Sequence, residues 1–154
     1  MSLNLYNTLT REVSPFTPIV KGKVGIYLCG ATVQAPPHIG HIRSGINFDI
    51  LRRWLIASGY EVTFIRNVTD IDDKILHNAI HEQMPWWALA QKYERVFTTA
   101  YAELNVMPPT YEPRATGHIT QMVELISLLI ERGKAYALPN GDVYLDVRSL
   151  ESYL

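Results

Sequence analysis

Strand, loop, helix and strand signals follow one another between residues 24 and 67, and this order constrains the fold more than any other feature of the sequence. Residues 24–29 form a short, mostly apolar run, which is typical of a strand buried on both faces. Residues 60–67 contain a second run of this kind. Two strands joined by a long helix form a βαβ unit, whose strands are parallel and whose crossover is right-handed. The sequence therefore predicts an α/β fold with a parallel sheet.

The ends of the connecting helix are marked by residues with known backbone preferences. Gly30 ends the first strand, and a loop over residues 31–37 closes with two prolines. Because proline is tolerated only in the first turn of a helix, we expect the helix to open near His38. Ser58 and Gly59 follow the last apolar positions at helical spacing, which indicates the C-terminal stop.

The other segments are expected to form local elements around this unit. In chain order they are a polar, extended lead-in over residues 1–20, a short helix ending near residue 83, a helix over residues 85–104, a proline-rich loop over residues 106–113 and an amphipathic helix over residues 119–133. Asp70 is expected to cap the short helix, with two further aspartates in its first turn. Residues 135–147 predict a β-hairpin near the C-terminus, with Asn140 and Gly141 in a type I′ turn.

Composition narrows the class of protein. A chain of 154 residues has about the size of one domain, and its net charge of −1 gives no general attraction to nucleic-acid phosphates or anionic membranes. No run of apolar residues approaches the ~18 that a membrane span needs. A single cysteine excludes a disulfide framework, and the N-terminus shows no secretory signal. We therefore expect a soluble, cytoplasmic domain.

Two histidines stand where the first strand gives way to the helix, at the edge where open α/β sheets bind ligands. His38 and His41 are three residues apart, so their side chains project from neighbouring positions on the first helical turn. The unpaired N–H groups and the positive dipole end of that turn already favour an anion. Two imidazoles there can hold a triphosphate and stabilise charge on a phosphorus under attack, and Gly40 lets a base or ribose lie against the backbone. The alternative is that the histidines merely begin a helix, but their place at a strand end favours the first interpretation.

Residues 38–41, His-Ile-Gly-His, match the HIGH motif of class I aminoacyl-tRNA synthetases. Further segments resemble the cysteinyl-tRNA synthetase family in the same order along the chain: residues 5–10, 29–33, 67–74, 112–116 and 141–144. The resemblance covers almost the whole chain and corresponds to the N-terminal portion of the family's catalytic domain. It implies a single domain with a Rossmann-like sheet, in which about residues 1–110 are the first half of the catalytic domain and about residues 111–154 begin a connecting insertion.

The resemblance implies cysteine–tRNA ligase activity, in which ATP converts L-cysteine to cysteinyl-adenylate before its transfer to tRNA(Cys). His38 and His41 would be the catalytic residues and, with Ile39 and Gly40, would bind ATP, which is accompanied by magnesium. Contacts with the tRNA would lie mostly outside this chain, and the enzyme would act as a monomer away from membranes. The KMSKS-type loop and the downstream parts of the family are absent, so we expect the chain to be inactive by itself.

Cys29 has two interpretations. A lone cysteine that ends a buried strand is usually a small core residue. By resemblance it is instead the first ligand of a catalytic zinc ion, whose other ligands lie outside this chain. A thiolate-bound zinc can take the substrate sulfur directly and binds the harder serine hydroxyl poorly, so discrimination needs no editing site.

The resemblance also implies which residues line the amino-acid or adenylate pocket. They are Cys29, Gly30, Thr32, Ser44, Asn67 and Thr69. All but Ser44 lie at the ends of the two predicted strands or directly after them, and the carboxyl ends of parallel strands meet at one edge of a sheet.

Two other functions remain open at this stage. The cysteine:glucosaminyl-inositol ligase of mycothiol synthesis shares the fold, the zinc and the adenylate chemistry, although Arg43 and residues 112–116 resemble the synthetase more closely. A non-catalytic module that binds an adenylate without turnover is the alternative from another class. Nucleotidyltransferases with a His-x-Gly-His sequence are disfavoured, because they give no reason for Cys29 or for residues 67–74.

Overall fold

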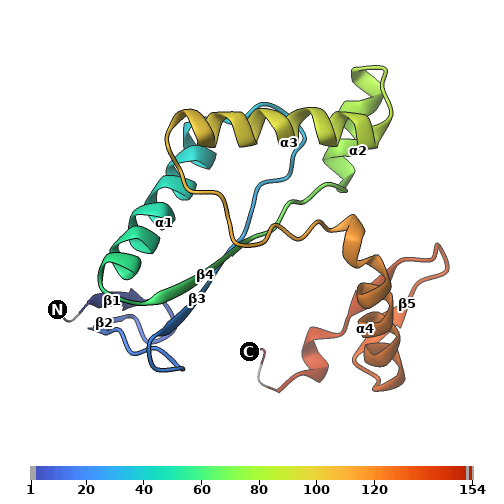
Figure 1. Ribbon diagram of the computed structural model, residues 1–154. Helices are drawn as coiled ribbons and strands as arrows, with labels where there is room; N and C mark the ends of the chain where they lie inside the picture. The colour runs from blue at the N-terminus through green and yellow to red at the C-terminus, as the bar shows by residue number, and fades with distance from the viewer. Residues whose placement is uncertain (1–2, 152, 154) are drawn as a thin grey trace. The chain divides into compact units, whose positions relative to one another are not determined.

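The computed structural model describes residues 3–151 and residue 153. The chain divides into two compact units, Met1–Arg114 and Ala115–Leu154. Figure 1 shows the helices and strands of both units. The first unit contains a parallel strand pair and the second an antiparallel hairpin, so the expected combination of a parallel sheet with a hairpin near the C-terminus is confirmed.

The first unit is built on two parallel strands joined by a long helix (Figure 1). These elements are β3 (Lys23–Leu28), α1 (Ile39–Ala57) and β4 (Glu61–Arg66). Leu28 pairs with Arg66 in the parallel register, so the carboxyl ends of both strands lie at the same edge of the sheet. His38 is the N-cap of α1 and Ser58 its C-cap, as the sequence predicts.

β3 is buried on one face only, which corrects the expectation of a strand buried on both faces. Val24 and Leu28 are buried, whereas Gly25 and Tyr27 are exposed. The reason is that α1 packs against one face of the two-stranded sheet, and alternate side chains of a strand point to opposite faces.

An antiparallel hairpin precedes β3, where the sequence predicts an extended lead-in over residues 1–20. Its strands are β1 (Asn4–Asn7) and β2 (Glu12–Pro15). Arg11 has a positive φ of 58° and donates its backbone N–H to the Asn7 carbonyl at 2.7 Å, which closes the turn. The prediction is wrong because every residue of both strands except Leu5 is exposed, so no buried face imposes an alternating apolar pattern on the sequence.

Two helices follow β4 and carry most of the core. They are α2 (Asp73–His81) and α3 (Trp86–Glu103), which confirms the predicted helix over residues 85–104. The buried cluster consists of Val33, Ile42, Val68, Ile75, Ala79, Leu89, Ala90, Tyr93, Phe97 and Tyr101. Side chains from α1, α2 and α3 therefore meet the two segments that follow the strands, and this packing fixes those segments in place.

The N-cap of α2 is Asp72, not Asp70 as the sequence predicts. Asp72 Oδ1 accepts the backbone N–H of Lys74 at 2.9 Å, whereas Asp70 is buried. The expected cap lies two residues too early because Thr69 still pairs with Thr32 in a parallel bridge, so the chain turns into a helix only after this extended stretch.

The proline-rich loop after α3 returns along the second edge of β4. Thr110 donates its N–H to the Phe64 carbonyl at 2.7 Å, and Val68 donates its N–H to the Pro113 carbonyl at 2.9 Å. Arg52 on α1 holds the start of this segment, because its Nη1 donates to the Pro108 carbonyl at 2.7 Å. The segment thus forms an irregular extended neighbour of β4 up to the last residue of the first unit.

The second unit contains one helix and one hairpin, as predicted. Its elements are the 3-10 turn Thr116–His118, α4 (Ile119–Glu131), β5 (Ala135–Ala137), β6 (Val143–Leu145) and the 3-10 turn Val147–Ser149. The hairpin turn is not type I′, because that type needs a positive φ at both central residues and only Gly141 has one, at 92°. Gly141 instead donates its N–H to the Leu138 carbonyl at 3.0 Å, and Asn140 Oδ1 accepts the Asp142 N–H, which gives a longer turn.

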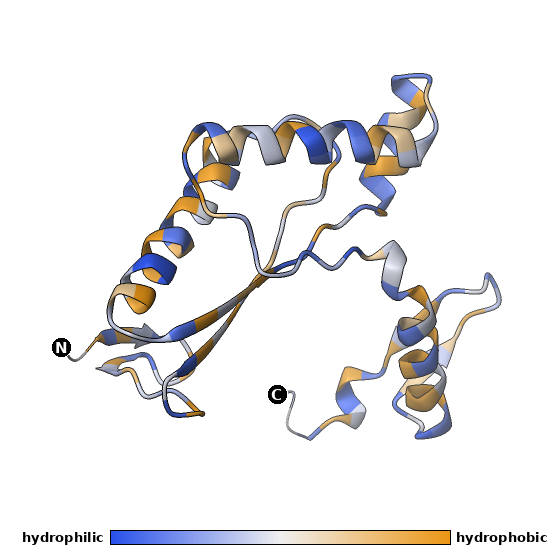
Figure 2. Cartoon of the chain, in the orientation of Figure 1, coloured by the Kyte–Doolittle hydropathy of each residue, from blue (hydrophilic) through white to orange (hydrophobic). Residues whose placement is uncertain are grey.

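Hydropathy is unevenly distributed along the helices, and Figure 2 shows α4 as largely apolar. α4 is the helix that the sequence predicts as amphipathic. Its apolar residues Met122, Val123 and Ile126 are exposed, so the apolar face of α4 is only partly covered. Over the part of the chain that the structure describes, no helix has both the length and the apolar character needed to cross a membrane.

Candidate functional site

The two segments that follow the strands lie side by side at the carboxyl edge of the sheet. Ala31 accepts the Thr69 N–H at 3.3 Å, and Thr32 pairs with Thr69 in a parallel bridge. The side chain of Asn67 joins the same segments, since its Oδ1 accepts the Gly30 N–H at 2.8 Å and its Nδ2 donates to Thr69 Oγ1 at 3.2 Å. The structure therefore brings together four of the predicted pocket residues.

Gly30 is a point of very close approach between these segments. A Cβ atom at Gly30 would lie 1.6 Å from the carbonyl oxygen of Asn67 and 2.8 Å from its carbonyl carbon. Only a residue without a side chain allows the two backbones to come this near. Glycine at this position is therefore a requirement of the site geometry.

The side chains of His38 and His41 both accept backbone N–H groups at the first turn of α1 and so cap this helix. His38 Nδ1 accepts the Gly40 N–H at 3.1 Å, and His41 Nδ1 accepts the His38 N–H at 3.3 Å, so the pair forms a reciprocal capping box. A ring nitrogen that accepts a hydrogen bond carries no proton, so in this arrangement each ring carries its proton on Nε2. The ring centroids are 3.9 Å apart. Two neighbouring N–H donors are thus available at the positive end of the helix.

Gly40 and Ile39 complete this turn. A Cβ atom at Gly40 would lie 2.9 Å from Cε1 and 3.1 Å from Nδ1 of His38, so a side chain there would displace the capping imidazole. Ile39 is 80% exposed, although it stands at the first position of the helix. The predicted nucleotide-binding residues 38–41 therefore form one continuous, accessible surface.

The environment of His41 favours its neutral form. Its ring meets Phe97 edge-on with centroids 5.3 Å apart, and its carbonyl accepts the Tyr101 hydroxyl at 3.4 Å. Partial burial lowers the pKa of His41 below 6.5, and the adjacent His38 lowers it further. Near neutral pH the ring is therefore an uncharged hydrogen-bond donor.

We expect NMR titration to place the pKa of His41 below 6.5, and His38→Asn to raise it only part of the way. Asparagine still caps the helix, and burial, the larger cause of the shift, remains. Because the folded pKa is the lower one, the unfolded chain binds the proton more readily. The stability from this group is therefore complete above pH 6.5 and decreases as the pH falls below that value. A pKa at or above 6.5 in the unmodified protein would contradict this assignment.

Cys29 and Ser44 lie outside the hydrogen-bonded cluster. Cys29 directly follows β3 and is exposed, which excludes the interpretation as a core residue. Ser44 is exposed on α1, one helical turn after His41. Within residues 3–151 and 153, no group of three or more His, Cys, Asp or Glu side chains is arranged to hold a metal ion. These residues alone therefore do not make a zinc site, and Cys29 offers one accessible thiol donor.

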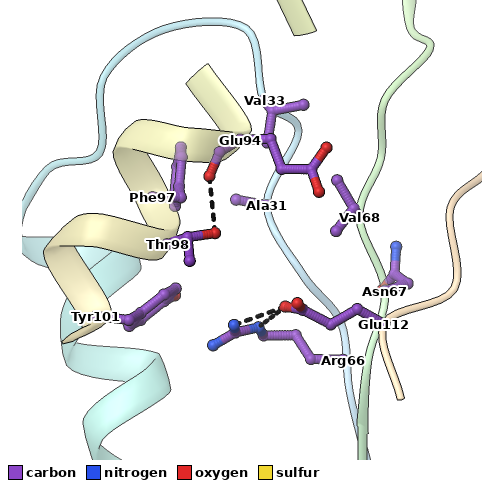
Figure 3. Close-up of a pocket in the computed structure, with 10 residues that line it drawn as sticks. All are labelled: Ala31, Val33, Arg66, Asn67, Val68, Glu94, Phe97, Thr98, Tyr101 and Glu112. Carbon is purple, nitrogen blue, oxygen red and sulfur yellow. Dashed lines mark hydrogen bonds and ion pairs between the residues drawn. The ribbon is translucent and has the colours of Figure 1, made fainter. Parts of the chain in front are cut away.

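A charged cluster beneath the strand ends was not predicted. Arg66 forms an ion pair with Glu112 at 2.7 Å, and its guanidinium lies 4.1 Å from the centroid of the Tyr101 ring (Figure 3). These three residues line a cavity of about 30 Å³ together with Asn67 and Phe97. Burial raises the pKa of Tyr101, so its hydroxyl stays protonated. The one signal in the sequence is an arginine inside an expected buried strand, since buried charges need a partner.

Sequence comparison places the chain among known proteins. Residues 15–154 match the family described as tRNA synthetases class I (C) catalytic domain. The cysteine–tRNA ligases of Streptomyces coelicolor and Streptomyces avermitilis are each 60% identical to the chain over all 154 residues. Those residues are 25% and 33% of the two proteins, so the chain spans a quarter to a third of the length of these curated relatives.

Solved structures share the fold. Mycobacterium tuberculosis methionyl-tRNA synthetase in complex with methionyl-adenylate matches with a TM-score of 0.65 at 22% identity, over 79% of this chain and 26% of that one. The agnB2 LeuRS of Agrobacterium radiobacter K84, in a ternary complex, matches with a TM-score of 0.67 at 19% identity, over 86% of this chain and 22% of that one. The expected α/β architecture is thereby confirmed.

Proposed function

Because the chain belongs to the family of class I (C) tRNA synthetase catalytic domains, we propose that it forms the first half of a domain that ligates L-cysteine to tRNA(Cys). The observation that supports this most directly is the position of the histidine pair. His41 contacts Phe97, and Phe97 lines the same cavity as Asn67 from the end of the second strand. The hydrogen-bond donors for phosphate thus lie next to the proposed polar pocket for the amino acid, at one edge of the sheet. Class I chemistry needs both.

The proposed reaction has two steps. A carboxylate oxygen of cysteine attacks the α-phosphorus of ATP, the bond to the bridging oxygen breaks, and pyrophosphate leaves, which gives cysteinyl-adenylate. A terminal ribose hydroxyl of tRNA(Cys) then attacks the carbonyl carbon of the adenylate, and AMP leaves as the new ester forms. Magnesium enters with ATP and offsets part of the phosphate charge.

His38 and His41 act in the first step. Their Nε2–H groups donate to non-bridging phosphate oxygens, whose negative charge increases as the carboxylate attacks. The capping box holds both rings before the substrate arrives, so little reorganisation is needed at the moment of reaction. The N-terminal turn adds the positive end of its helix dipole, whereas the N–H groups of His38 and Gly40, which the sequence predicts to be unpaired, donate to the capping imidazoles. The backbone at Ile39 and Gly40 supplies the surface for the nucleotide.

The strand-end segments bind the amino acid and its adenylate. Asn67 and Thr69 are oriented by their mutual hydrogen bond, and Gly30 allows its segment to approach the backbone of Asn67 closely enough to hold them in place. Thr32 stands opposite Thr69 and adds a second hydroxyl. We assign Ser44 to the same site because it follows His41 by one turn on the exposed face of α1.

Cys29 is proposed as one ligand of a zinc ion whose remaining ligands lie outside this chain. Support comes from the donor itself, an exposed thiol at the end of β3, next to Gly30 of the pocket. Bound zinc would select the cysteine thiol over the serine hydroxyl, because a soft thiolate suits this metal better.

The second unit is proposed to begin the connecting insertion of the catalytic domain. The boundary between the units, at Arg114 and Ala115, falls close to the predicted change near residue 110. Contacts with tRNA are assigned mostly to parts of the enzyme outside this chain. Since tRNA charging serves translation, we place the enzyme in the cytoplasm.

ATP–pyrophosphate exchange tests the proposal in two proteins, the 154-residue chain and a full-length protein that contains it. The 154-residue chain by itself should show no cysteine-dependent exchange, because it spans a quarter to a third of its relatives. A protein of the relatives' full length that carries this chain should exchange with cysteine but not with serine, and should charge tRNA(Cys). Ligation of cysteine to an amino sugar instead, or tight binding of a cysteinyl-adenylate analogue without exchange, would overturn the proposal. Robust exchange by the short chain would refute its expected inactivity.

A further inference from the structure

A second histidine pair lies on α2, outside the residues assigned above. His77 and His81 are four residues apart on one face of the helix, and both are exposed. Their Nε2 atoms are 3.0 Å apart, and their ring centroids are 4.5 Å apart with an interplanar angle of 71°. We propose that this pair chelates a divalent transition-metal ion at the protein surface, with Cu²⁺ or Ni²⁺ bound more tightly than Zn²⁺.

The arrangement supplies two convergent donors. Imidazole nitrogen suits first-row divalent metals, and two histidines at i and i+4 on a helix are a spacing with which proteins bind zinc. The two Nε2 atoms are already adjacent, and both rings are exposed, so each can turn its lone pair away from the other ring and toward a shared ion. Without an ion, one Nε2 donates a proton to the other. When the ion binds, that proton moves to Nδ1 of the same ring, so the pair need not lose a proton overall.

The distance between the two nitrogen atoms indicates which ions fit. With metal–nitrogen bonds of about 2.05 Å, donors 3.0 Å apart subtend about 94° at the ion. Tetrahedral zinc prefers about 109°, whereas square-planar or octahedral ions take about 90°. In the general affinity order for divalent metals, Cu²⁺ exceeds Ni²⁺ and Zn²⁺, so this order also favours copper at the site. Geometry therefore favours Cu²⁺ and Ni²⁺.

The surroundings of the histidine pair leave the site exposed to solvent, so a bound ion can exchange readily. Asp73 stands one turn before His77 on the same face of the helix. Glu82 is engaged elsewhere, since it accepts from Lys92 at 2.6 Å and from Tyr93 at 2.5 Å. Over residues 3–151 and 153, no third metal-ligating side chain completes the pair, so water fills the other positions.

Calorimetric titration of Ni²⁺ into the protein, in a buffer that does not chelate metals, tests the assignment. We expect one saturable site on α2, located by ¹H–¹⁵N NMR as line broadening around His77 and His81. His81→Ala should weaken binding by about tenfold or more, because a single imidazole loses the advantage of chelation. Zn²⁺ should bind more weakly than Ni²⁺ in the same experiment.

A matched variant keeps the number of histidines but breaks their alignment. Leu76 is exposed, so the double variant Leu76→His/His77→Ala places the two rings five residues apart, on different faces of the helix. It should bind Ni²⁺ as weakly as His81→Ala. Circular dichroism should show unchanged helix content in both variants, since each changed side chain is exposed.

The histidine pair on α1 provides the opposing test. The double variant His38→Asn/His41→Gln should retain the Ni²⁺ site on α2. If Ni²⁺ binding is lost in that variant and survives in His81→Ala, or if Zn²⁺ binds more tightly than Ni²⁺ at His77 and His81, the proposal is overturned. This inference does not rest on the proposed aminoacylation, because exchange activity measured without added metals other than Mg²⁺ and Zn²⁺ should be the same with and without His81.

Discussion

Replacing Gly30 with alanine is expected to abolish binding of a cysteinyl-adenylate analogue and to lower the free energy of unfolding by about 3 kcal/mol, the upper part of the range for overpacking. The new Cβ would stand 1.6 Å from the Asn67 carbonyl oxygen, which is backbone and cannot rotate away. The strand ends must therefore separate, and the 2.8 Å hydrogen bond from Gly30 N–H to Asn67 Oδ1 is lost with them. Urea unfolding and calorimetric titration of the analogue measure the two effects.

Gly25→Ala is the matched control for this variant. Gly25 lies in the same strand, β3, and a Cβ atom there would meet nothing within 4 Å. The free energy of unfolding should change by about 0.5 kcal/mol or less, as is usual for exposed positions. If Gly30→Ala were as harmless as Gly25→Ala, the close approach of the two segments would not be a feature of the protein in solution.

His41→Gln is expected to slow adenylate formation by about 100- to 1,000-fold, the usual effect of removing one preorganised donor to a transition-state oxyanion. Glutamine at this position can still reach back to the N-cap N–H, as in ordinary capping boxes, so α1 should remain folded. The variant thus removes the imidazole donor but keeps the cap. Cysteine-dependent ATP–pyrophosphate exchange in the full-length protein measures the rate, and KM for ATP should change much less than kcat.

His118→Ala controls for the loss of a histidine elsewhere. His118 belongs to the second unit and has no part in the proposed chemistry, so exchange should proceed at the unmodified rate. An unchanged rate in His41→Gln would show that the two imidazoles of α1 only begin a helix. That outcome would restore the simpler interpretation of the His-x-x-His spacing.

The parallel unit of the fold is predictable because its signals are local. Gly30 ends a strand, His38 opens a helix and Gly59 follows its end, and each acts through its own backbone preferences. The N-terminal hairpin escapes prediction because its strands are polar and exposed, with Leu5 as their one partly buried residue. Asp70 is mistaken for a cap because a tertiary pairing, between Thr32 and Thr69, delays the helix.

In the candidate site, too, the residues that are close in sequence are predictable, and the contacts between distant residues are not. His38, Gly40 and His41 are neighbours in sequence, so their spacing reveals their shared turn. Arg66 and Glu112, in contrast, are 46 residues apart, and no periodic pattern connects them. Their pairing depends on the course of the loop after α3, which the sequence predicts only as irregular. Long-range contacts of this kind need the three-dimensional structure.

The attachment of residues 110–114 to β4 fixes the course of the chain up to the last residue of the first unit. Pro113 accepts the Val68 N–H, and Val68 adjoins Asn67, so one hydrogen bond and one peptide bond join this segment to a residue that we propose binds the substrate. A displacement of residues 110–114 would therefore disturb the proposed amino-acid pocket without touching it directly.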